Sequence, residues 1–362
     1  MLSPPHAVVD APPSATYRAN LVTIVLGTWF TFGLFLDAWA HSNLTDLETF
    51  FTPWHGVFYT GFVCTAGWIL ATAHTGWRPG RDLRSIPAGY AAAAVAVVGF
   101  GIAAVGDMLW HTAFGIEQSI DILFSPTHLG LIAAMFVILT TPLRSMWADP
   151  SLPAAPGTRR LLPALLSLSL STTLVLLFLQ YANALTLDSH VVVAGLTGAD
   201  EGLTVELVSS IAVTNLVLLM PLLTLARRWV PPFGTATMLY AALGALSSAI
   251  TAFENFAMIV GLLVAGVGVD LLASRLRPTP PRLRQFRLFA ALAPLITWTV
   301  YIATAYLTTR ADAGMRPPAM VELVTGTPLL QALLGLLVGI MLVPGGGHLS
   351  DHAPATTTAD AA

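Results

Sequence analysis

A short polar phrase that combines aspartate, histidine, proline and a hydroxyl residue occurs twice in this chain. In each copy an Asp precedes a His by four residues at the end of an apolar run, and a second His follows Phe, a hydroxyl residue, Pro and one further residue. The first copy holds Asp37, His41, Glu48 and His55, and the second holds Asp107, His111, Asp121 and His128. Carboxylates and imidazoles bind metal ions in proteins, so the repeat predicts a pair of metal sites.

Helix geometry would bring the ligands of one copy together. Residues four apart lie on one face of a helix, so Asp37 and His41 would present an oxygen and a nitrogen to the same point. Thr52 is a typical N-cap and Pro53 suits the first helical position, which places His55 in the first turn of a returning helix. The second copy has the same order. Each copy therefore predicts two His and one carboxylate, a set suited to copper, zinc or iron(II).

Two further carboxylates belong to the repeated phrase. Glu48 and Asp121 each stand seven residues before the second His of their copy. They are candidates for a fourth metal ligand or for a hydrogen-bond acceptor that orients a ligand His. The spacing leaves open whether the copies build one composite site or two separate ones. It also leaves the catalytic residues unknown, and caps at helix ends that bind no metal remain the structural alternative.

The elements that position these residues must lie in a membrane. The 362 residues are 55% hydrophobic and only 10% charged, with a mean hydropathy of +0.75, whereas a soluble domain has about 25% charged residues. The single cysteine, Cys64, excludes a disulfide framework or a cysteine-based zinc site. We find no glycine-rich phosphate loop and no nucleic-acid-binding patch. The lipid bilayer is the expected partner, and no nucleic acid is.

The apolar runs predict an all-α, polytopic helical bundle. A helix needs about 20 apolar residues to cross a bilayer, and we count about ten such runs. They cover 19–40, 54–74, 86–110, 126–146, 161–185, 204–226, 235–253, 255–273, 286–307 and 327–343. The seventh and eighth runs form one stretch that we divide at 253–255, its only polar break.

The chain divides into four parts on this basis. Residues 18–148 hold the duplicated metal-site hairpins, with repeats over 18–77 and 86–148, and residues 160–344 form the remaining bundle. The Pro- and Ala-rich segment 1–17 and the Gly-, Ala- and Thr-rich segment 345–362 are predicted to be disordered.

The arginines predict the orientation. All sixteen basic residues are Arg, and most of them fall in alternate loops between the apolar runs. Because basic loops stay on the cytoplasmic side, both termini are expected in the cytoplasm. The chain would then be a multi-pass protein of the cytoplasmic membrane with both metal sites facing outside.

The first copy, with Phe58 and Tyr59 just beyond its second His, resembles a membrane subunit of the copper membrane monooxygenases, the particulate methane and ammonia monooxygenases. In that family the Asp and the two His of the phrase bind copper. The resemblance implies copper at Asp37, His41 and His55, and by extension at the second copy. It also implies association with other membrane subunits or with further copies of the chain.

Two functional classes follow from these observations. One is a copper-dependent monooxygenase, or a subunit of one, that oxidises a small hydrophobic substrate. The other is a protein for the uptake or handling of copper or zinc that carries out no redox catalysis. Few other polar residues lie deep in the apolar runs, which favours a surface site over a path across the membrane.

Overall fold

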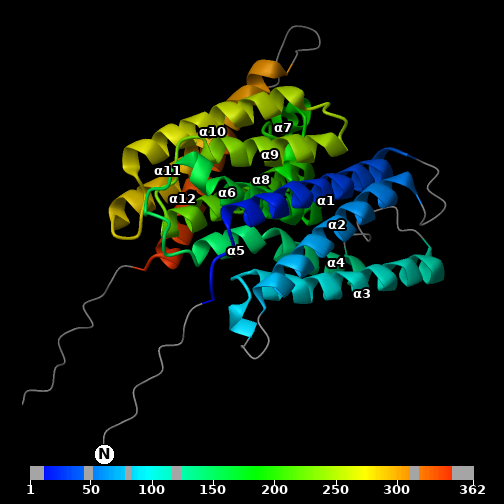
Figure 1. The fold of residues 1–362 in the computed structure, drawn as a ribbon. Helices are drawn as coiled ribbons and strands as arrows, with labels where there is room; N and C mark the ends of the chain where they lie inside the picture. Colours follow the sequence, from blue (N-terminus) through cyan, green and yellow to red (C-terminus); the bar gives the residue numbers. More distant parts are fainter. Residues whose placement is uncertain (1–11, 45–51, 78–82, 116–123, 310–317, 345–362) are drawn as a thin grey trace, which may run out of the picture.

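The computed structural model describes residues 12–44, 52–77, 83–115, 124–309 and 318–344 as a helical bundle (Figure 1). The long helices are Tyr17–Asn43 (α1), Pro53–Gly76 (α2), Tyr90–Phe114 (α3), Pro126–Leu139 (α4), Thr158–Phe178 (α6), Glu201–Arg228 (α8), Thr235–Ile250 (α9), Phe256–Leu276 (α10), Leu283–Thr308 (α11) and Val321–Leu342 (α12). Short helices cover Leu83–Ser85 (η1), Thr141–Trp147 (α5), Gln180–Ala182 (η3), Ala184–Thr186 (η4) and Ser189–Gly195 (α7). The predicted all-α polytopic class is confirmed.

Every predicted apolar run contains a helix, but one helix is short for a span. Within the described residues, nine helices are long and apolar enough to cross a membrane, counting α4 and α5 as one span over Pro126–Trp147. The tenth, α9, has 16 residues, which at 1.5 Å per residue cover about 24 Å of a hydrocarbon core about 30 Å thick. An apolar stripe on α3 (Val95, Val98, Ile102, Val105 and Leu109) is exposed, as expected for a helix in contact with lipid.

Two predicted boundaries can be compared with the structure. The division of the seventh run is confirmed, because α9 ends at Ile250 and α10 begins at Phe256, with positive φ at Ala252 and Phe253. The fifth run was predicted to be helical as far as 185, but α6 ends at Phe178. The chain then turns through η3 and η4, and the Asn183 side chain holds this turn by accepting a hydrogen bond from the Leu185 N–H and donating one to Ser247.

Close packing of α1 on α2 builds the first hairpin. A Cβ placed on Gly33 would lie 2.6 Å from the Phe58 Cα, and one on Gly61 would lie 2.8 Å from the Phe30 Cα. Only glycine permits this approach of two backbones. The packing brings the start of α2 beside the end of α1, where the polar phrase lies.

The two hairpins lie side by side and turn at the same end of the bundle (Figure 1). Their shared core takes one large side chain from each of five helices, namely Phe30, Phe58, Phe100, Met135 and Leu174 from α1, α2, α3, α4 and α6. The Phe100 ring stacks on Phe62 with centroids 4.2 Å apart. This apolar core therefore fixes both hairpin ends against α6.

The opposite end of the bundle gathers the arginines. The Tyr17 hydroxyl donates a hydrogen bond to the Arg159 carbonyl, and Arg228 donates to the Asp149 carbonyl. Residue 12, where description of the chain begins, and residue 344, where it stops, both lie at this end (Figure 1). Residues 1–11 and 345–362 of the predicted tails lie outside the described residues, so their disorder stays a prediction.

The remaining bundle packs around α11. Its buried Phe286, Phe289, Trp298 and Tyr301 form a core with α8, α9 and α10. One buried carboxylate here is structural: Asp270 on α10 accepts hydrogen bonds from the Ala236 and Thr237 N–H groups at the start of α9 and from the Thr237 hydroxyl.

Candidate metal centre

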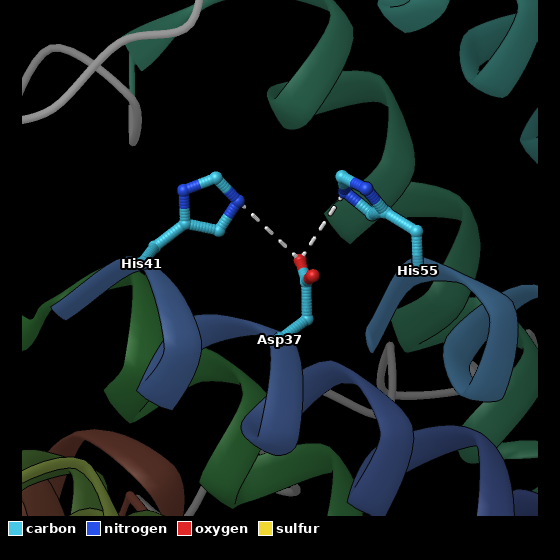
Figure 2. Close-up of side chains that lie close together, drawn as sticks. All are labelled: Asp37, His41 and His55. Carbon is cyan, nitrogen blue, oxygen red and sulfur yellow. Dashed lines mark ion pairs between the residues drawn. The ribbon is translucent and has the colours of Figure 1, made fainter. Parts of the chain in front are cut away.

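Three side chains of the first phrase converge on one point, and we call them the first triad: Asp37, His41 and His55 (Figure 2). Asp37 and His41 stand one turn apart at the end of α1, and His55 lies in the first turn of α2. The Asp37 Oδ2 atom is 3.4 Å from His55 Nε2 and 3.9 Å from His41 Nε2. The predicted meeting of two helix ends is therefore present.

These distances distinguish a hydrogen bond from a metal site. Nitrogen and oxygen atoms that share a hydrogen bond lie about 2.7–3.2 Å apart, and both separations exceed that range. Ligand atoms about 2.0–2.1 Å from a common tetrahedral ion lie about 3.3 Å from one another. The first triad is thus spaced like ligands around a small ion.

The helix cap orients the His55 ring. The Thr52 hydroxyl accepts a hydrogen bond from the His55 backbone N–H at 3.2 Å, as an N-cap does, and lies 3.3 Å from Nδ1 of the same ring. This contact turns Nε2 toward Asp37. Ligand His residues commonly use their second nitrogen in such a hydrogen bond.

The second phrase repeats this geometry, and its members, Asp107, His111 and His128, form the second triad. The Asp107 oxygens lie 3.6 Å from His111 Nε2 and 3.4 Å from His128 Nε2. Ser125 caps α4 and lies 2.6 Å from His128 Nδ1. Within each triad the possible ligand atoms lie within 4.8 Å of one another.

The two triads differ at one position. Thr127 donates a hydrogen bond to Asp107 Oδ1 at 3.0 Å, whereas the equivalent residue of the first copy is Trp54, which has no hydroxyl. Within the described part of the chain, Asp37 Oδ1 is buried without a hydrogen-bond partner. A buried unpaired carboxylate oxygen costs free energy, and a cation in the first triad would stabilise it. The donor set of the first triad therefore fits a metal ion.

Both triads open into one cavity. A cavity of about 120 Å³ is lined by Asp37, His41 and His55 from the first triad and by Asp107 and His128 from the second. Phe58, Phe100, Leu131, Met135 and Leu174 also line it. A single water needs about 10–15 Å³ by this measure, so a larger molecule would fit beside both sites.

One polar residue of this cavity lies outside the repeated phrase. Gln180, at the start of η3, lines the cavity opposite the hairpins. The sequence pattern did not join it to the site, since its one signal was a polar residue near the end of the fifth apolar run. Glu48 and Asp121, the predicted additional ligands, lie outside the described residues and stay predictions.

Known proteins offer no guide to this arrangement. No family model matches the chain, and searches of curated proteins and of solved structures found no match. The resemblance to the copper membrane monooxygenases therefore rests on the repeated phrase alone. What stands from the structure is a membrane-spanning helical protein with two Asp/His/His groups that could hold metal ions.

Proposed function

We propose that this chain is a membrane metalloprotein that binds one copper ion in each triad. The observation that carries the proposal is the repeated Asp–His spacing of 3.4–3.9 Å, too long for a hydrogen bond and suited to ligands around an ion. Zinc and iron(II) accept the same donors, but copper(II) binds such sites most tightly among the common divalent metals. The resemblance to the copper membrane monooxygenases supports the same choice.

Oxidation of a small hydrophobic substrate is the activity that we assign to the site. Three protein ligands leave open positions on an ion, and copper bound there would supply the redox chemistry. The chain's own part is to hold the ligands and to offer an apolar cavity next to them, walled by Phe58, Phe100 and Met135. An apolar molecule arriving from the bilayer would be desolvated at no cost in such a cavity.

Metal uptake or handling is the competing function. A transport path would need polar side chains that continue from the site toward the other face of the membrane. The described side chains beneath the triads are instead the aromatic core formed by Phe30, Phe58 and Phe100. This arrangement favours a site that holds its metal.

The orientation follows the arginines. The hydrogen bonds at Arg159 and Arg228 gather basic loops at the end of the bundle opposite the triads. If the basic end is cytoplasmic, then the triads face outside the cytoplasmic membrane and both termini lie inside. Other membrane proteins, or further copies of this chain, would pack against the apolar faces.

Metal analysis of purified variants tests the proposal. We expect the wild type to hold two copper ions per chain and His55→Ala and His128→Ala to hold one each, because each triad is complete by itself. His190→Ala, which changes a histidine outside the triads on α7, should keep both ions. Oxygen consumption with a small alkane or alkene then separates oxidation from metal handling.

Two results would contradict the proposal at different levels. A wild-type protein that binds neither copper, zinc nor iron(II) after incubation would make the repeated phrase structural. Loss of both ions in His55→Ala would instead mean that the triads form one composite centre.

A further inference from the structure

The corner between α6 and η3 bridges the two hairpins. Before the corner, Leu177 and Phe178 pack with Leu34, Phe35 and Ala38 on α1. After it, the Tyr181 ring lies 6.0 Å from the Phe124 ring, next to the cap of α4. Gln180 lies between these two contacts and lines the shared cavity.

Gln180 has no structural task that is visible in the described chain. Its side chain is half-buried, and it has no hydrogen bond to any of the residues that the structure describes. The turn itself is held by Asn183 through Ser247 and the Leu185 N–H. The Gln180 amide is therefore available to a molecule in the cavity.

Charge decides what that molecule is. If each triad holds a divalent ion, as proposed above, the two ions bring four positive charges. The charged groups lining the cavity, among the described residues, are the carboxylates of Asp37 and Asp107, which bring two negative charges. A net charge of two in an apolar, poorly solvated cavity is costly, and a bound anion would reduce it.

We propose that the shared cavity is the binding site of one small inorganic anion, held between the two metal-loaded triads by a hydrogen bond from the Gln180 amide. The inference rests on the proposed metal binding. Hydroxide is the anion of this class that water supplies, and azide is a probe with a spectroscopic signal on copper(II).

Azide titration of the copper(II)-loaded protein tests this site, with metal content measured in every sample. We expect one azide per chain, followed by charge-transfer absorption and by electron paramagnetic resonance. Gln180→Leu should keep both ions and bind azide about tenfold more weakly or worse, because a hydrogen bond to a charged group is lost. Tyr181→Phe, the neighbouring control, should match the wild type since its ring is retained.

Two more variants sharpen the charge argument. Gln180→Glu places a carboxylate in the cavity, so both ions should stay bound while azide binding is lost. His128→Ala, with one ion, leaves the Asp107 charge uncompensated beside the cavity. Azide should therefore bind about tenfold or more weakly to it than to the doubly loaded wild type.

The outcomes separate the two proposals. Absence of bound metal would refute the proposed function. A fully loaded protein that binds no azide, that binds two equivalents independently, or that binds azide equally well in Gln180→Leu would refute the anion site while leaving metal binding in place. The first of these results would indicate that Glu48 or Asp121 supplies the compensating charge.

Discussion

Two buried aspartates of this chain predict opposite responses to the same substitution. Asp37 belongs to the first triad and has one buried oxygen without a hydrogen-bond partner among the described residues. Asp270 accepts three hydrogen bonds at the start of α9, at 2.6–3.0 Å. Changing each to Asn removes a negative charge and almost no volume, so the pair forms a matched comparison.

The expected magnitudes follow from ligand binding and from hydrogen bonding. At a free metal concentration 100 times the dissociation constant, one site stabilises the fold by about 2.7 kcal/mol. If Asp37→Asn weakens binding about 100-fold, the same concentration stabilises that site by only about 0.4 kcal/mol. The metal-dependent gain at the first triad should therefore fall by about 2.3 kcal/mol. Without metal, Asp37→Asn should be no less stable than the wild type, because it removes an unsatisfied buried charge.

Asp270→Asn should behave in the reverse manner. The amide group cannot accept all three hydrogen bonds, and loss of one hydrogen bond to a charged acceptor costs about 1.5–3 kcal/mol. That loss should be present with and without metal, while the metal-dependent gain stays complete. Thermal unfolding followed by the fluorescence of the nine tryptophans, with and without copper, measures both quantities. If Asp37→Asn lowers the stability of the metal-free protein as Asp270→Asn does and keeps the metal-dependent gain, then Asp37 is structural and the reasoning fails.

Three further predictions concern topology, packing and the second triad. In a cysteine-free background, Leu44→Cys and Ala113→Cys, both exposed at hairpin ends, should each react with a membrane-impermeant thiol reagent in whole cells; labelling of one alone would refute parallel hairpins. Gly33→Ala should destabilise the protein by about 1–3 kcal/mol and weaken the first metal site, because its Cβ would meet backbone atoms of α2. Gly67→Ala, with open space around it, is the control for that unfolding measurement. Thr127→Val should weaken metal binding at the second triad about tenfold and spare the first, and equal affinities in a metal titration would count against it.

The sequence predicted the hairpin ends well because the governing interactions are local. Residues four apart on a helix must share a face, and Thr52 and Ser125 cap their helices as expected. The division at residues 253–255 was recoverable for the same reason, since polar residues interrupt an apolar run there. Each of these features depends on a few neighbouring residues.

Features that depend on distant contacts were not predictable. The early end of α6 is set by Asn183 with Ser247, 64 residues away, and nothing near 178 in the sequence marks it. Gln180 reaches the cavity only because of that turn. The question of one site or two was likewise open, and the structure brings the ligands together as two triads that open into one cavity.

The difference between the triads gives them different dependence on a metal. In the second triad, Thr127 satisfies an Asp107 oxygen and the Ser125 hydroxyl lies within hydrogen-bonding distance of both Thr127 and His128. This network holds the ligands in place whether or not an ion is bound. In the first triad, Trp54 replaces the hydroxyl and the Asp37 oxygen has no such partner among the described residues. Because an ion would supply what Trp54 cannot, metal binding should stabilise the first hairpin more than the second.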